Sequence, residues 1–283
     1  MKKVIKTFLK SISSLLVNSI VTTVIGRYFL DQVLNSVMSR TWKVRHQGLD
    51  LTFAMPNSLN YFRINTFSTK EPETLEWIDG IPKGSVVWDI GANIGLYSCY
   101  AAKARECEVF AFDPSVFNLE LLARNVFLNN LTDKVIIVPL PLCEDLCRST
   151  LNMTSVEWGG ALSTFGKDYG WDGKKMQKVF EFQTLGISMD AANKILNIPL
   201  PHYIKIDVDG IEHLILKGGF EVLKKVNGLL IEVNDDFHEQ ADLCQQLLTL
   251  AGLVLQEKRH SEMFDSLDAM GGGHVWNQIW TRK

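Results

Sequence analysis

The stretch that most constrains the fold is Val86–Ser98, which reads VVWDIGANIGLYS. It begins as an apolar run ending in Asp89, passes through a turn containing Gly91 and Gly95, and continues with a helical pattern. A strand, a turn and a helix in this order predict a turn at the carboxyl end of a parallel strand, where open α/β sheets bind ligands. Glycines there let a ligand lie against the backbone. Asp89 is placed to accept from an ammonium group or an ordered water.

Two cofactor classes bind at such a turn. A dinucleotide site normally has the pattern G-x-G-x-x-G, whose middle glycine admits a pyrophosphate. Here the turn has only two glycines, and Asn93 stands near the point where a pyrophosphate would approach. S-adenosylmethionine (SAM) contains no pyrophosphate and needs room for its methionine part. The turn therefore favours SAM over a dinucleotide, and a strand-to-helix turn without any ligand is the remaining alternative.

A second acidic strand supports a cofactor site. Val109–Asp113 (VFAFD) is another apolar run that ends in an acid, 24 positions after Asp89. In dinucleotide folds an acid about 20 residues beyond the glycines holds the ribose hydroxyls. We therefore predict that Asp113 binds a ribose.

The rest of the chain alternates between strand and helix patterns. Strands are expected at Val135–Leu140, His202–Asp209 and Gly228–Val233, and helices at Leu96–Lys103, Asn118–Asn129, Met189–Leu196, Ile211–Lys225 and Glu239–Ala251. These spacings suit right-handed crossovers and a parallel sheet. Leu253–Arg259 and Val275–Arg282 are two late strands with no helix of normal length between them. Such a terminal antiparallel pair is typical of class I methyltransferases and unusual in nicotinamide dehydrogenases.

Three segments stand outside this alternation. Leu51–Asn65 has a short β-like pattern with a turn at residues 56–58, and Glu71–Asp79 is expected to be a helix that can cap the cofactor cleft. Thr150–Phe182 is an insertion rich in glycine and aromatic residues. An insertion of this length is usually functional or disordered, and the aromatic residues argue against disorder. They suit either stacking on a sugar or the packing of a small hairpin on the domain.

The first 45 residues differ in charge from the remainder. They hold eight Lys or Arg residues and one acid, Asp31, which gives +7 and leaves −10 of the total of −3 for the rest. Apolar residues recur at helical spacing over residues 1–39, but Ser, Thr and Asn interrupt them, which fits neither a secretory signal nor a spanning helix well. The alternatives are a basic amphipathic helix on an anionic membrane surface and a helix packed on the domain or on a second subunit.

Composition sets the domain organisation. A chain of 283 residues, 46% of them apolar, can bury one substantial core. We therefore expect a helical extension at residues 1–45 and a single domain at residues 46–283. The acidic main part argues against a nucleic-acid binder. Five scattered cysteines without zinc-site spacing favour reduced thiols and a cytoplasmic protein, peripheral at the inner membrane face if the extension binds there.

Four motifs together resemble the FkbM-type family of SAM-dependent methyltransferases. They are Asp89–Gly95 (DIGANIG), Phe112–Pro114 (FDP) with Asn118, Lys205–Glu212 (KIDVDGIE) and Ile231–Asn234 (IEVN). The resemblance runs from about Glu71 to Arg259. It implies a class I fold with a mostly parallel seven-stranded sheet, and methyl transfer to an oxygen, often on a sugar, glycolipid, polysaccharide or polyketide. Many members have Glu in place of Asp113 and Asp209, which keeps the charge.

The resemblance also implies roles in cofactor binding. The residues that would approach the methionine part of SAM are Gly91, Asn93 and Gly95. Asp113 would take the ribose hydroxyls, and Pro114 and Asn118 would shape the adenosine side.

Three carboxylates lie at strand ends that should converge on one cleft. Asp207 ends the fourth strand, Glu212 begins the following helix, and Glu232 lies near the end of the fifth strand. A sugar hydroxyl is a poor nucleophile, so a base within hydrogen-bond reach would assist methyl transfer. We predict that Asp207 or Glu232 is the base or acceptor anchor, with Glu212 supporting. The spacing of Asp207 and Asn234 does not demand a bridging metal, and none is expected.

Structural roles remain as alternatives for the acids. Glu212 suits the first turn of a helix, where it interacts with the helix dipole. Glu232 can pair with Lys205 from the neighbouring strand. His213 has the side chain of a base, yet a lone histidine on a helix is more often structural.

The function that the sequence favours is methyl transfer from SAM to a hydroxyl of a sugar, glycan or lipid-linked saccharide. A SAM-binding scaffold without turnover is the alternative, and a dehydrogenase is disfavoured by the turn and the late strands. The acids at 89, 113, 207 and 232 argue against a site that has lost its activity.

Overall fold

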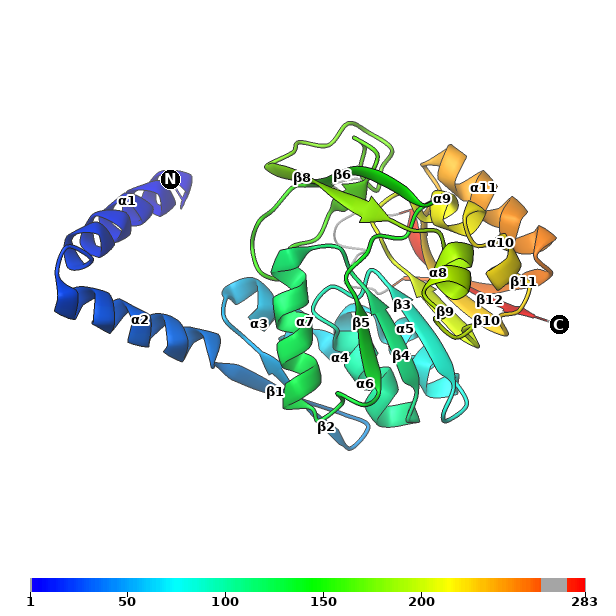
Figure 1. Cartoon of the computed structure of the whole chain (residues 1–283), viewed down its shortest axis with the longest axis horizontal. Helices are drawn as coiled ribbons and strands as arrows, with labels where there is room; N and C mark the ends of the chain where they lie inside the picture. Colours follow the sequence, from blue (N-terminus) through cyan, green and yellow to red (C-terminus); the bar gives the residue numbers. More distant parts are fainter. Residues whose placement is uncertain (1, 261–273, 283) are drawn as a thin grey trace.

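The computed structural model describes residues 2–260 and 274–282, and its centre is a seven-stranded sheet of order β11-β12-β10-β9-β3-β4-β5 (Figure 1). In this order the strands are Leu253–Arg259, Val275–Arg282, Gly228–Asn234, Tyr203–Ile206, Val86–Ile90, Glu108–Phe112 and Val135–Val138. The strands from β10 to β5 pair in parallel, and β12 runs antiparallel to both β10 and β11. The predicted class I fold, with its late antiparallel pair, is confirmed.

The direction in which successive strands are added to the sheet reverses between β3 and β9. From β3 the chain builds outward through β4 and β5, and from β9 it builds the opposite way through β10. Parallel pairing aligns Ile90 at the end of β3 with Ile206 at the end of β9. Such a switch point is where open α/β sheets bind ligands. It brings the turn after β3 and the loop after β9 together.

Alternation along the strands divides the core between the two faces of the sheet, because successive side chains point to opposite sides. Val87 packs on the face covered by α5 (Pro72–Gly80), α6 (Leu96–Arg105) and α7 (Val116–Leu128). Trp88 and Ile90 pack on the other face. The helices there are α8 (Met189–Ile195), α9 (Glu212–Lys217), α10 (Phe220–Leu223) and α11 (His238–Leu250).

The insertion folds as a small antiparallel sheet of order β7-β6-β8. Its strands are Ser163–Phe165, Cys147–Met153 and Phe180–Gly186. Packing accounts for Phe165, which is buried in the core, and for Tyr169, whose ring lies 5.4 Å from that of Phe237. Trp171 instead lines the cavity described below.

The segment before the central sheet differs from the sequence prediction. β1 (Thr41–His46) and β2 (Leu49–Ala54) pair as a hairpin, but Ser58–Asn65 is a helix, α3. The β-like prediction for this stretch is therefore wrong beyond residue 54. The side chain of Asn57 accepts a hydrogen bond from the N–H of Asn60 at 2.8 Å and so caps the helix. A short helix, α4 (Phe67–Lys70), follows.

The helix expected at Ile211–Lys225 is also interrupted. α9 ends before Gly218 and α10 begins after Gly219. A Cβ atom at Gly219 would lie 2.0 Å from the Cε atom of Met189, and one at Gly218 would lie 2.3 Å from the carbonyl oxygen of Cys143. The chain bends where these two glycines admit the neighbouring elements.

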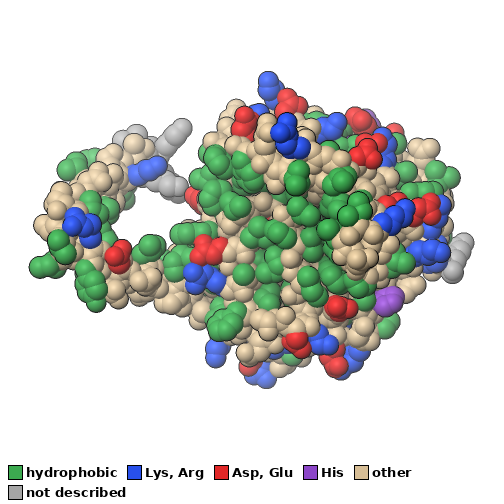
Figure 2. All heavy atoms as spheres, in the orientation of Figure 1, with side chains coloured by type: hydrophobic (Ala, Val, Ile, Leu, Met, Phe, Trp, Pro, Cys, Tyr) green, Lys and Arg blue, Asp and Glu red, His purple; other side chains and the backbone are tan. Residues whose placement is uncertain are grey.

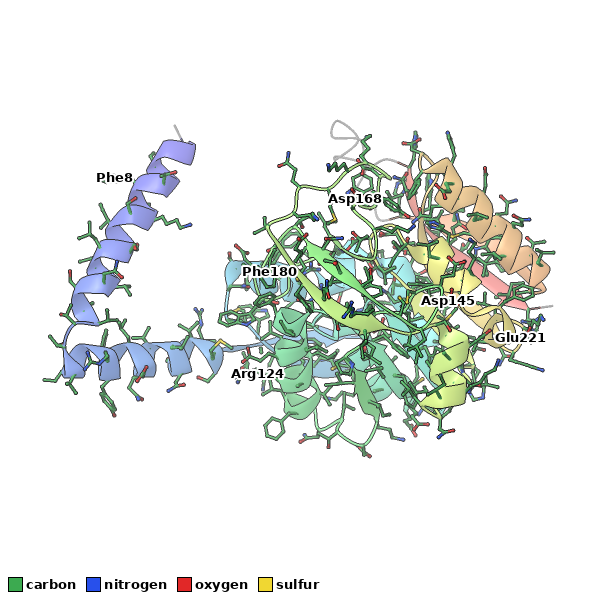
Figure 3. All side chains as sticks on the ribbon, turned by 45° about the horizontal axis from the view of Figure 1, so that its top comes forward. Phe8, Arg124, Asp145, Asp168, Phe180 and Glu221 are labelled. Carbon is green, nitrogen blue, oxygen red and sulfur yellow. The ribbon has the colours of Figure 1, made fainter. Side chains whose placement is uncertain are left out.

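The N-terminal residues form an arm of two helices, α1 (Lys2–Ile20) and α2 (Val24–Met38), which extends away from the sheet (Figure 1). Thr23 separates them, because its side chain accepts from the N–H of Gly26 and caps α2. Apolar side chains are exposed at several places along the arm (Figure 2), and Phe8 projects from α1 (Figure 3). In the described ranges, no helix is both long and apolar enough to span a membrane.

Candidate active site

A cavity of about 430 Å³ lies at the carboxyl ends of β3, β9 and β10, and a smaller one of about 70 Å³ adjoins it toward β4 and β5. The residues that line both are Gly91, Asn93, Ala161, Asp207 and Asp209. Asp113, Pro114 and Asn118 line only the smaller cavity. Glu232 lines only the larger one. The fold thus gathers most of the predicted site residues around two connected spaces.

The two glycines of the turn have different neighbours. Gly91 has φ +84°, and a Cβ atom there would lie 1.8 Å from the carbonyl oxygen of Asp207, so the loops after β3 and β9 touch backbone to backbone. Gly95 lines neither cavity. A Cβ atom at Gly95 would lie 2.2 Å from Cδ1 of Leu122, so this glycine admits α7 instead of approaching a ligand as expected.

Asp113 is a buried carboxylate at the end of β4, 5% exposed. It accepts hydrogen bonds from the backbone N–H groups of Asn93 and Ser115, each at 2.8 Å. Burial nevertheless raises the pKa of Asp113 to about 7. Beside it, the buried atoms Oδ1 of Asn118 and Oγ of Ser115 find no hydrogen-bond partner among the described residues.

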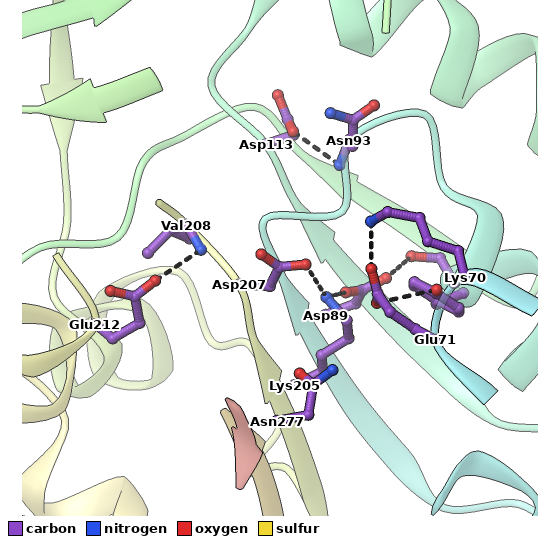
Figure 4. Close-up of polar contacts among 12 residues, drawn as sticks. Lys70, Glu71, Asp89, Asn93, Asp113, Lys205, Asp207, Val208, Glu212 and Asn277 are labelled. Carbon is purple, nitrogen blue, oxygen red and sulfur yellow. Dashed lines mark hydrogen bonds and ion pairs between the residues drawn. The ribbon is translucent and has the colours of Figure 1, made fainter. Parts of the chain in front are cut away.

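A buried lysine connects two predicted site residues (Figure 4). Lys205, 3% exposed, donates to Oδ2 of Asp207 at 3.0 Å, and its Nζ lies 4.0 Å from Oδ1 of Asp89. Asp89 itself lines neither cavity and accepts from the hydroxyl of Ser98 at 2.5 Å. It lies beneath Lys205, whereas the sequence suggested direct contact with a ligand.

The charges of this group act on one another. Burial lowers the pKa of Lys205, but the carboxylates of Asp207 and Asp89 outweigh burial, and the net pKa is raised. Burial raises the pKa of Asp207, yet Lys205 and other nearby cations hold it below its ordinary value. Asp207 is therefore ionised, ion-paired and only weakly basic.

Glu232, half-buried near the end of β10, has the opposite character. Burial, with the nearby carboxylates of Asp207 and Glu71, raises the pKa of Glu232 well above its ordinary value. Within the described part of the chain its carboxylate makes no hydrogen bond or ion pair, and the alternative pairing with Lys205 is absent. Glu232 is thus the more basic of the two carboxylates that were candidates for the base.

Glu212 and His213 lie outside both cavities. Glu212 is 1% exposed and accepts from the N–H groups of Val208 at 3.1 Å and Gly210 at 3.0 Å, so it holds the loop after β9 in place. His213 is fully buried, and its ring lies 5.9 Å from that of Phe237. Neither side chain reaches the cavity that Glu232 lines.

Several residues of the larger cavity were not predicted. Glu71 is buried and accepts from the hydroxyl of Tyr97 at 3.0 Å and from the Nζ of Lys70 (Figure 4). Asn277 on β12 donates to Oε1 of Glu73 at 2.8 Å. The expectation that residues 71–79 cap the cleft pointed to this wall, but it did not name the side chains.

The insertion contributes a backbone segment, the 158–162 strap, which lies across the boundary of the two cavities. Its carbonyl oxygens accept hydrogen bonds from side chains on several elements: Asn60 to Trp158 at 2.8 Å, Arg63 to Gly159 at 2.9 Å, and Asn93 and Asn118 to Gly160 at 2.9 and 3.2 Å. The N–H of Leu162 donates to Asp209 at 2.7 Å. The strap is therefore bound to α3, α7 and the loops after β3 and β9.

Comparison with known sequences decides the family. The profile of the Methyltransferase FkbM domain matches residues 89–271, more than half of the chain. The chain belongs to the FkbM methyltransferase family. Among curated proteins, the hexuronic acid methyltransferase AglP of Haloferax volcanii is 28% identical over 187 residues, 66% of this chain and 72% of that protein.

Solved methyltransferase structures align with this FkbM methyltransferase at low sequence identity. A Streptococcus mutans protein assigned as a SAM-dependent methyltransferase aligns over 85% of this chain and 55% of its own, with a TM-score of 0.51 and 11% identity. The FkbM methyltransferase of Methylobacillus flagellatus KT aligns over 80% of this chain and 55% of its own, with a TM-score of 0.46 and 16% identity.

The FkbM methyltransferase is SAM-dependent, and the residues present fit this cofactor. The smaller cavity offers a buried carboxylate, Asp113, and the unpartnered oxygens of Asn118 and Ser115. These are acceptors for the hydroxyl and amino groups of a nucleoside. Asp113 and Asn118 would hold the adenosine part, and the shared wall at Gly91 and Asn93 would face the methionine part.

Exchanging Asp113 for Asn should weaken SAM binding and stabilise the cofactor-free protein. Loss of the charged acceptor should cost about 1–3 kcal/mol of binding, measured by calorimetry. The folded protein binds the Asp113 proton more tightly than the unfolded chain does, because the pKa rises from 3.8 to about 7. Asp113 therefore costs stability that grows as pH rises through this interval, at most about 4 kcal/mol.

The melting temperature of Asp113→Asn should accordingly exceed that of the wild type at pH 8, and the difference should shrink toward pH 4. Asp133→Asn, at an exposed position, is the matched control. Unchanged SAM affinity in Asp113→Asn would remove the ribose role.

Proposed function

We propose that this methyltransferase transfers the methyl group of SAM to a hydroxyl of a sugar in a glycan or lipid-linked saccharide. The observation that carries the proposal is Glu232, a carboxylate of raised pKa without a partner in the described structure, facing the same cavity as Gly91. A group of this kind suits removal of a proton from a weakly acidic hydroxyl. The name of the relative from Haloferax volcanii also refers to a sugar acid.

The residues that line the larger cavity have separate roles in the proposed reaction. SAM supplies a methyl group already activated as a sulfonium. Glu232 accepts the proton of the acceptor hydroxyl. Asp207, held in place by Lys205, accepts a hydrogen bond from a second hydroxyl and aligns the sugar. Trp171 and Phe62, which both line the larger cavity, offer ring faces on which a sugar can stack.

Cell-envelope glycans from strains with and without the protein should differ by methyl groups on sugar oxygens, and mass spectrometry measures the difference. Restoring the wild-type gene should restore the methyl groups, and restoring the Glu232→Gln variant should not. A protein that binds SAM while the glycans stay unchanged would favour the scaffold alternative.

We also propose that the arm of α1 and α2 binds an anionic membrane surface. Residues 1–39 hold five Lys or Arg residues and one acid, a net charge of +4, and large apolar side chains on the arm are open to solvent, among them Phe8 at 65% and Ile25 at 82% exposure. A basic helix with exposed apolar residues partitions into the interface of anionic bilayers.

Full-length protein should co-sediment with vesicles containing anionic lipid, and the bound fraction should fall as salt rises, because salt screens the attraction. A form beginning at residue 40, which keeps the hairpin of β1 and β2, should stay in solution. The double variant Phe8→Glu, Ile25→Glu should bind weakly, whereas Phe127→Glu, at an exposed apolar site on α7, should bind as the wild type does. Equal sedimentation of all forms would favour packing or oligomerisation of the arm.

A further inference from the structure

The larger cavity has a cofactor end and an open end. Gly91, shared with the smaller cavity, marks the cofactor end. Leu59, Phe62 and Arg63 lie on one face of α3 and line only the larger cavity. Phe62 and Leu162, which also lines this cavity, are 50% and 42% exposed, so the larger cavity is open to solvent on this side.

Arg63 on this wall is held in position without an acidic partner. Its Nε donates to the carbonyl oxygen of Gly159 at 2.9 Å, which orients the guanidinium plane. Its Nη atoms make no hydrogen bond or ion pair within residues 2–260 and 274–282. The other lysine and arginine side chains of the cavity, Lys70 and Lys205, are both ion-paired with carboxylates.

The cavity's charge limits what Arg63 can bind. Five carboxylates, Glu71, Glu73, Asp207, Asp209 and Glu232, line it against three Lys and Arg side chains. Arg63 balances part of this charge, since it helps to lower the pKa of Asp207. A dianionic phosphate would add more repulsion than a single carboxylate. A planar carboxylate also matches the two free Nη groups, which can donate to both of its oxygens.

We propose that Arg63 binds the carboxylate of a uronic acid in the acceptor saccharide. This inference rests on the proposed sugar methyltransferase function and names its substrate class. Arg63 then selects acidic saccharides at the open end, while Glu232 and Asp207 act at the hydroxyl to be methylated.

The test is saturation-transfer NMR on the full-length protein loaded with S-adenosylhomocysteine. The probes are the methyl glycosides of glucuronic acid and glucose, and glucose 6-phosphate. We expect the wild type to bind the glucuronide at least tenfold more tightly than the glucoside. Arg63→Gln keeps an N–H that can donate to Gly159 but loses the charge, and should weaken glucuronide binding about 10–100-fold while leaving glucoside binding unchanged.

Two further variants complete the design. Arg63→Lys keeps the charge without the fork and should be intermediate. Arg124→Gln removes a solvent-exposed arginine that pairs with Glu120 on α7 (Figure 3), and should bind as the wild type does.

Equal binding of glucuronide and glucoside by the wild type, or no effect of Arg63→Gln on the glucuronide, would overturn the proposal. So would tighter binding of the sugar phosphate, or a loss of S-adenosylhomocysteine affinity in Arg63→Gln, which would assign Arg63 to the methionine carboxylate. The proposed function fails separately: Arg63-dependent glucuronide binding together with unmethylated envelope glycans contradicts methyl transfer but leaves the role of Arg63 intact.

Discussion

Glu232→Gln should lower turnover about 10²–10⁴-fold, the contribution of a general base, while SAM affinity remains near that of the wild type. The amide keeps the shape of the side chain and cannot accept the hydroxyl proton. Because the base acts in its ionised form, wild-type kcat/KM should fall as pH drops through the raised pKa of Glu232. This fall should be absent from the residual activity of the variant. Turnover as a function of pH and SAM affinity, measured on the same samples of wild type and Glu232→Gln, check the loss of activity and the pH dependence.

Three companion variants make the assignment decisive. Asp207→Asn should keep much of the activity, since an amide still hydrogen-bonds an acceptor. Glu239→Gln, at an exposed position on α11, should be neutral, and His213→Ala should change turnover far less than Glu232→Gln does. A near-normal rate in Glu232→Gln with a collapse in Asp207→Asn would move the base to Asp207.

Lys205→Met should lower the free energy of unfolding by about 3–5 kcal/mol near neutral pH, because it leaves buried carboxylates without their cation. Lys205 is 3% exposed and lies between Asp207 and Asp89. Its raised pKa means that its stabilisation is complete below the unfolded value of 10.5 and is lost as pH rises through the folded value. The lowered pKa of Asp207 adds stability above 3.8 that is lost as pH falls through its folded value.

Urea denaturation of the wild type and of Lys205→Met, carried out from acid to alkaline pH, measures the difference in their free energies of unfolding. The deficit of Lys205→Met should shrink in acid, where protonation removes the uncompensated carboxylate charge. Lys224→Met, which breaks the exposed pair with Glu221, should lower the free energy of unfolding far less than Lys205→Met does, because solvent screens that pair. An equal decrease in the free energy of unfolding in the two variants would show that the buried ion pair of Lys205 stabilises the fold no more than an exposed pair does.

The sequence predicted the sheet well because most of its strands are apolar runs, and the three runs that end near Asp89, Asp113 and Asp207 need no tertiary information to be recognised. The parallel pairing followed from spacings between strands and helices that suit right-handed crossovers. The same local patterns placed most of the predicted site residues at the two cavities, because strand ends in a parallel sheet share one edge.

The features of the site that the sequence did not predict depend on distances between residues far apart in the chain, which no local pattern encodes. Asp207 and Glu232 look alike as strand-end acids, and only the position of Lys205 separates an ion-paired carboxylate from a basic one. Arg63 belongs to α3, whose cap at Asn57 lies inside the turn that the sequence indicated at residues 56–58. Glu71 precedes α5, where the sequence predicted a helix but not the side chain that reaches the cavity. Gly95 resembles a ligand-binding glycine, but its contact with Leu122 is made by a helix that follows later in the chain.

The 158–162 strap is held through its main chain. Its carbonyl oxygens accept from fixed asparagine and arginine side chains, and an acceptor of this kind is supplied by any amino acid. Gly159 and Leu162 are restricted by their backbone: Gly159 has φ +81° and a Cβ atom there would lie 2.5 Å from Oδ1 of Asn60, and Leu162 has φ +61°. The side chains of Trp158 and Ala161 can therefore be exchanged without loss of these backbone hydrogen bonds, whereas position 162 favours residues that tolerate a left-handed backbone. Acceptor preference can evolve in this segment while the cofactor site beneath it is conserved.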